Sequence, residues 1–193
     1  AFNVDKIWYS FPIGDDITVF AGGAIENYYM YVTPSIYKPG ALKAFKLGGN
    51  SNFGASTDVG FGFKYEADNG FAIASNIVDK NADGTGFFQN DSVSKWDTQF
   101  AYTQPRYHLS LTLSNAQLWE SQLYNATALG EDTAADSMGY AARAYWMPEE
   151  TGTAVPEISV GYDVKVWDDA ANGAVDEAAS WMIGLTSVSY THL

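Results

Sequence analysis

The chain has 193 residues, a formal net charge of −13 and no cysteine. The acidic excess argues against a nucleic-acid partner, because a phosphate backbone is bound by Lys and Arg. The lack of cysteine excludes disulfides, zinc–thiolate sites and thiol nucleophiles.

Apolar and polar residues alternate along nine stretches, and this period of two predicts β-strands. The predicted strands span residues 2–11, 16–26, 57–67, 70–78, 92–103, 106–115, 137–147, 156–167 and 179–188. Helical periodicity is nearly absent, and no stretch approaches the ~18 consecutive apolar residues of a transmembrane helix. We therefore expect an all-β fold.

The connections between these strands alternate in length. Short turns at 12–15, 68–69, 104–105 and 148–155 contain the Gly, Pro, Asp and Asn residues that tight turns need. Long connections lie between them, at 27–56, 79–91, 116–136 and 168–177. An up-and-down barrel of an outer membrane has this asymmetry, although a soluble sandwich can also produce it.

One face of each predicted strand is apolar and the other polar. Along the sixth strand Tyr107, Leu109, Leu111 and Leu113 alternate with His108, Ser110, Thr112 and Ser114. In the first strand we place Ile7, Tyr9 and Phe11 outward and Lys6, Trp8 and Ser10 inward. Aromatic residues on the apolar faces collect beside the short turns, as in the interfacial girdle of a membrane barrel. They are Tyr9, Phe11, Tyr65, Phe71, Tyr102, Tyr107 and Trp146.

Nine strands leave an unpaired edge, which a bilayer does not tolerate, and bacterial single-chain barrels favour even strand numbers. We therefore expect residues 1–186 to form about half of a larger antiparallel, up-and-down transmembrane β-barrel of roughly 16 strands. Residues 187–193 resemble a translated sequencing adapter and are interpreted as a doubtful, non-native tail.

Several runs of the sequence resemble those of a known protein family. They include NVDKIWYSFP at 3–12, IENYYM at 25–30, TPSIYKP at 33–39, LGGN at 47–50, GASTD at 54–58 and ISVGYD at 158–163. These runs resemble the cyanobacterial outer-membrane porins of the iron-uptake type, which are related to carbohydrate-selective porins. The resemblance implies passive diffusion of small hydrophilic solutes and inorganic ions across the cell outer membrane, as a homotrimer in contact with lipid. It implies contact with peptidoglycan only through an amino-terminal domain that these residues lack.

The connection 27–56 contains Lys38, Lys43 and Lys46 and no acidic residue. We expect it to fold into the lumen and form a basic constriction, because rings of basic side chains favour anions. An external loop with solvated lysines is the alternative. The expected lumen-facing charges on the strands are Lys6, Lys64, Glu66, Asp97, Arg143, Asp163 and Lys165, most of them in cross-strand pairs on a solvated polar face.

Other chemistry has little support in the sequence. Asp79, Asn81 and Asp83 match the opening of a calcium-binding loop, but its twelfth position is Asn90 instead of Glu, so turn formation explains these residues better. With two histidines, no catalytic triad or metal set can be assembled, and we expect neither enzymatic activity nor a cofactor. The main alternative function is a secreted or surface all-β carbohydrate-binding module, in which the apolar faces would be buried.

Overall fold

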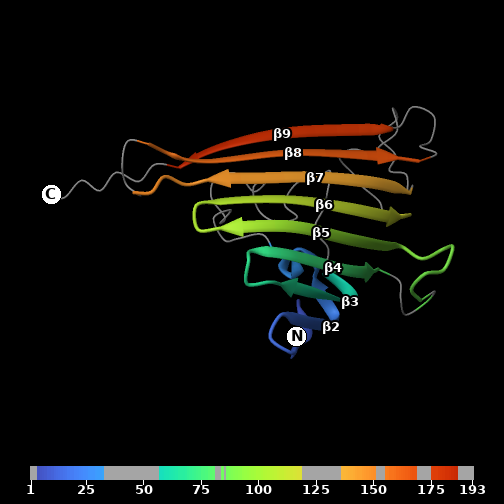
Figure 1. The fold of residues 1–193 in the computed structure, drawn as a ribbon. Helices are drawn as coiled ribbons and strands as arrows, with labels where there is room; N and C mark the ends of the chain where they lie inside the picture. Colours follow the sequence, from blue (N-terminus) through green and yellow to red (C-terminus); the bar gives the residue numbers. More distant parts are fainter. Residues whose placement is uncertain are drawn as a thin grey trace.

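The computed structural model describes residues 4–32, 57–80, 84, 86–118, 136–150, 155–168 and 175–186. Within these ranges nine strands pair in chain order as one antiparallel sheet (Figure 1). The strands are β1 Ile7–Ile13, β2 Ile17–Glu26, β3 Thr57–Glu66, β4 Phe71–Asp79, β5 Ser94–Gln104, β6 Tyr107–Gln117, β7 Ser137–Trp146, β8 Glu157–Trp167 and β9 Glu177–Thr186. A single turn of 3-10 helix, η1, follows β2 at Asn27–Met30. The predicted all-β, up-and-down order is confirmed.

The largest difference from the predicted strand limits is at the start of β1. β1 begins at Ile7 instead of residue 2 and continues through Pro12 to Ile13. Proline is tolerated there because β1 is an edge strand, in which a missing N–H need not break a ladder. β9 begins at Glu177, two residues before the predicted start.

The short turns between β3 and β4 and between β5 and β6 lie at the same end of the sheet, on the left in Figure 1. The β1–β2 turn uses Gly14 at a φ of 66°, and the β3–β4 turn uses Gly70 at 90°. These values lie in the left-handed region that glycine enters without a Cβ clash. The Asn69 side-chain oxygen accepts a hydrogen bond from the Phe71 amide at 3.0 Å and tightens the second of these turns.

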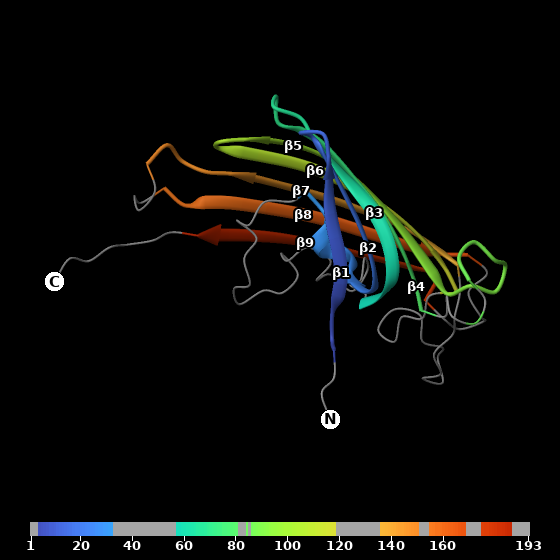
Figure 2. The same cartoon turned by 90° about the horizontal axis from the view of Figure 1, so that it is seen from below.

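The sheet is strongly curved (Figure 2), and the side chains on its two faces differ in chemistry. The apolar face lies on the outside of the curve and carries most of the large exposed apolar side chains. η1 lies on the inside of the curve (Figure 2), and polar-face residues such as Asn76 and Asp97 bond to it, so the polar face is the inner one. In β6 the alternation is complete: Tyr107, Leu109 and Leu111 are exposed, whereas His108, Ser110 and Thr112 are buried.

A small apolar cluster lies on the inside of the curve, next to η1. Phe20 and Ile25 of β2 meet Met30 of η1 and Val78 of β4, and Trp8 packs against them. Ile25 reaches this cluster because a bulge between Gly22 and Ile25 shifts the register of β2 against β3. The inward position predicted for Trp8 is therefore observed.

The sheet is not closed into a barrel. Within the described residues β1 pairs with β2 alone, and β9 pairs with β8 alone. Both edges therefore carry unpaired backbone groups on their outer sides.

Candidate pore-lining face

The inside of the curved sheet holds a row of buried charged and amide side chains. Because side chains alternate along a strand, residues two apart share this face. The central members come from three strands and are all buried: Lys95, Asp97 and Gln99 of β5, Arg143 of β7, and Asp163 and Lys165 of β8. We call this set the inner row.

Asp97 is the centre of the best-connected part of the inner row. Its side chain is fully buried, and its Oδ2 accepts hydrogen bonds from Asn27 Nδ2 at 2.9 Å and from Tyr31 Oη at 2.6 Å. Lys95 Nζ lies 3.7 Å from the same oxygen. Burial, and then the negative charge of Asp97, raises the pKa of Tyr31 well above its ordinary value, so the hydroxyl remains protonated and donates. The carboxylate therefore has both a countercharge and two hydrogen-bond donors.

Two further contacts fix the segment that follows β2. The Val32 amide donates to Gln99 Oε1 at 2.9 Å, and Gln99 Nε2 in turn donates to Thr112 Oγ1 at 3.0 Å. Asn76 Nδ2 donates to the carbonyl oxygen of Asn27 at 3.3 Å. The first six residues of the connection 27–56 are thus attached to β4 and β5 on the inside of the curve.

Arg143 and Asp163 form a second buried pair across β7 and β8. Arg143 Nη1 contacts Asp163 Oδ1, and Nη2 donates to Oδ2 at 2.8 Å, so the contact is bidentate. Gly161 lies opposite Arg143 in the β7–β8 register, and a Cβ there would come within 3.1 Å of Arg143 Cδ. The missing side chain at Gly161 therefore leaves room for the guanidinium to reach Asp163.

The remaining predicted inward charges lie nearer the ends of the strands. Lys6 forms an ion pair with Glu26, and its ammonium lies 5.1 Å from the centre of the Tyr29 ring. Lys64 is half-buried and Glu66 exposed, close to the short β3–β4 turn. Lys165 belongs to the inner row, and its ammonium lies 5.2 Å from the centre of a ring of Trp167, which shares its strand face.

Some candidates fall outside the described residues, and these include Lys38, Lys43 and Lys46. Asn81 and Asp83 of the calcium motif also lie outside, whereas Asp79 is buried at the end of β4. Among the residues that the structure describes, no group of three or more His, Cys, Asp or Glu side chains could hold a metal ion.

Sequence reasoning missed the partners of Asp97. Asn27 and Tyr31 are 70 and 66 positions away from it in the chain, and no local pattern marks them. Gln99 carried a signal, because it follows Asp97 at the spacing of one strand face. Ile77 lies on the apolar face of β4 but is 5% exposed, and it lines the same cavity as Phe88.

Comparison of the chain with protein-family models, curated proteins and solved structures gives no match. In the described part of the chain, no helix has the length and apolar character needed to cross a membrane.

Proposed function

We propose that the chain forms part of the wall of an outer-membrane porin through which small hydrophilic solutes and inorganic ions diffuse. The observation that carries this proposal is the inverted distribution of side chains on the sheet. Trp181, Leu185 and Leu109 on the outside are 74%, 66% and 61% exposed, whereas Asp97 and Asp163 on the inside are both 0% exposed. In water it is unfavourable to expose large apolar side chains and to bury charged ones. The same arrangement is favourable where lipid surrounds the apolar face and the polar face lines the interior.

The distribution of charge on the outer face supports a lipid environment. Asp79 and Glu177 share the register of the apolar face, and both stand at strand ends away from the short turns. The middle of that face, in β3 to β9, carries apolar and small polar residues. A basic residue at the midplane would cost about 2–4 kcal/mol, and the cost falls toward the interfaces.

The aromatic residues beside the short turns support the same orientation. Tyr9, Phe71, Tyr102, Tyr107 and Trp146 are all at least 40% exposed, and all lie on the outside. The rings of Tyr102 and Tyr107 are 6.1 Å apart across the β5–β6 turn. Amphipathic rings at one height suit the boundary between lipid and headgroups.

The carbohydrate-binding module has less support. A sandwich covers the apolar face of one sheet with a second sheet about 10 Å away. The described residues contain a single sheet, and it is the polar face that is covered. In the porin proposal lipid takes the place of the second sheet on the apolar face, and a loop folded into the lumen covers the polar face.

Closing the barrel requires further strands, and the topology limits their number. Because neighbouring strands are antiparallel, β1 and β9 run in the same direction. An antiparallel sheet can join these two edges only through an odd number of additional strands, which gives an even total. The roughly 16 strands expected for the barrel meet this condition.

In this proposal the connection 27–56 narrows the passage. Its first residues are attached to the inside of the wall through Asp97 and Gln99, which gives the remainder of the loop a starting point in the lumen. Lys38, Lys43 and Lys46 would then present positive charge to passing ions and favour anions. The homotrimer follows from the resemblance to cyanobacterial porins.

Single-channel recording of the native protein, isolated from its own cells, tests the function. We expect stepwise conductance that rises with salt concentration. When Lys38, Lys43 and Lys46 are changed to Glu, the reversal potential in a salt gradient should shift to a value that indicates greater selectivity for cations. A protein that leaves the bilayer insulating would contradict the porin function. Conductance with an unchanged reversal potential would contradict the role of the three lysines alone.

A further inference from the structure

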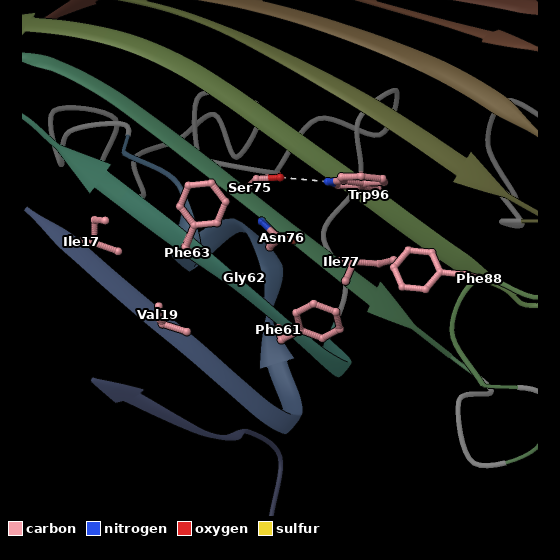
Figure 3. A pocket seen from close by; sticks show the side chains of 10 residues that line it. All are labelled: Ile17, Val19, Phe61, Gly62, Phe63, Ser75, Asn76, Ile77, Phe88 and Trp96. Carbon is pink, nitrogen blue, oxygen red and sulfur yellow. Dashed lines mark hydrogen bonds between the residues drawn. The ribbon is translucent and has the colours of Figure 1, made fainter. Parts of the chain in front are cut away.

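A cavity of about 470 Å³ lies on the apolar face of β2 to β5 (Figure 3). β2 contributes Ile17 and Val19, β3 contributes Phe61 and Phe63, and β5 contributes Trp96. These residues alternate with the inward-facing ones, so the cavity belongs to the outside of the curve. We call it the outer cavity.

An aromatic segment of the β4–β5 connection covers one side of the outer cavity. The Phe87 ring lies 5.4 Å from that of Phe61, and the Phe88 ring lies 6.4 Å from that of Trp96, centre to centre. Phe88 has a φ of 63°, a left-handed conformation that is rare for a bulky side chain, and Gly86 has a φ of 79°. The backbone therefore adopts an uncommon shape that brings two apolar rings onto the sheet.

The two polar side chains that line the outer cavity from the apolar face, Ser75 and Trp96, are hydrogen-bonded to protein groups. Trp96 Nε1 donates to Ser75 Oγ at 2.9 Å, and Ser75 Oγ also lies 3.0 Å from Thr98 Oγ1. The Asn76 amide turns to the other face, where it donates to Asn27. A sugar or an ion would lose its hydration here without replacement, whereas an alkyl chain would not.

We propose that the outer cavity binds one acyl chain of a membrane phospholipid. The inference depends on the proposed function, because it takes the apolar face to be in contact with lipid. The volume lies within the roughly 300–1,000 Å³ of typical ligand pockets. The cavity is continuous with the exposed apolar residues of the same face, so a chain in the bilayer can enter it while its headgroup stays at the interface.

The position of Trp96 allows a direct test by fluorescence quenching. Phospholipid with brominated acyl chains quenches tryptophan on contact, and it is added in one to two equivalents to the chain in micelles of non-brominated detergent. The signals of Trp96 and Trp181 are obtained by subtracting those of W96F and W181F from the wild type. Trp181 lies on the apolar face of β9, outside the outer cavity, and reports non-specific contact.

We expect saturable quenching of Trp96, at least twofold greater than that of Trp181. Val19→Phe, which fills the outer cavity, should abolish the excess, whereas Val160→Phe on the apolar face of β8 should not. Phe88→Ala, which removes part of the cover without adding bulk, should raise the lipid concentration needed for half-saturation several-fold. Equal quenching of Trp96 and Trp181 in micelles would overturn the proposal. So would the finding that a neighbouring copy of the chain covers Trp96 and prevents its quenching by the brominated phospholipid.

A second arm separates this inference from the proposed function. In vesicles made wholly of brominated phospholipid, both Trp96 and Trp181 should be quenched if the apolar face meets lipid. Quenching of both in vesicles without the excess at Trp96 in micelles would remove the acyl-chain site alone. An absence of quenching at Trp181 in vesicles would remove the lipid-facing sheet, and the site with it.

Discussion

Replacing Asp97 with Ala should weaken the inner wall and release the segment attached to it. The change removes the acceptor of the Asn27 and Tyr31 hydrogen bonds and the countercharge of Lys95, whose side chain is 1% exposed. Removing one partner of a buried ion pair costs about 3–5 kcal/mol, because the other charge stays buried. We expect the free energy of unfolding, measured with urea in detergent micelles, to fall by this amount.

Hydrogen exchange gives a local measure of the same change. The Val32 amide donates a hydrogen bond to Gln99 Oε1, and Gln99 belongs to the inner row together with Asp97. A local loss of about 3 kcal/mol corresponds to about 100-fold faster exchange. Asp97→Asn, which keeps an acceptor oxygen but not the charge, should have an intermediate effect.

Asp15→Ala in the exposed β1–β2 turn is the matched control, and it should stay within about 0.5 kcal/mol of the wild type. If Asp97→Ala also left stability within that range and Val32 exchange unchanged, Asp97 would not hold this segment.

Three other substitutions test separate parts of the structure. Arg143→Ala should lower the free energy of unfolding in urea by about 3–5 kcal/mol, because Asp163 stays buried without its partner. Arg106→Ala breaks an exposed pair with Glu149, 3.6 Å away, and should cost at most about 1 kcal/mol. Similar costs for the two variants would contradict a buried pair at Arg143. Leu111→Lys lies at the middle of the apolar face of β6 and should destabilise the lipid-embedded protein by about 2–4 kcal/mol. Ile13→Lys lies beside a short turn and should cost about 0–1 kcal/mol. Equal costs would contradict the proposal that Leu111 lies deep in the bilayer and Ile13 near its surface. Gly70→Ala should lower the thermal midpoint, because φ is 90° and a Cβ would lie 2.1 Å from a backbone oxygen; an unchanged midpoint would mean that the turn can adopt another shape.

Strand order and the two faces could be predicted because a pleated strand imposes a period of two. Leu109, Leu111 and Leu113 form the outer row of β6 as expected, and Asp163 and Lys165 form part of the inner row. Where that period is interrupted, prediction fails. The β2 bulge places Ile25 in the inner cluster, although uninterrupted alternation from Ile17 would place it outside.

Long-range contacts could not be predicted from periodicity. Nothing near Asn27 indicates that it will meet Asp97, because the contact depends on how the segment after β2 crosses the sheet. The same limit applies to Phe88, which lies between β4 and β5, has a left-handed backbone and places its ring 6.4 Å from that of Trp96. The functional expectation for Lys38, Lys43 and Lys46 stays a prediction.

Spin labels along β6 in the membrane-embedded protein test most directly whether the apolar face meets lipid. The chain has no cysteine, so single cysteines at Leu109, Leu111, Ser110 and Thr112 can each be labelled without a background signal. We predict that labels at Leu109 and Leu111 collide mainly with oxygen, which concentrates in the bilayer, and that labels at Ser110 and Thr112 do not. Collisions of the Leu109 and Leu111 labels mainly with a water-soluble nickel chelate would contradict a lipid-facing sheet.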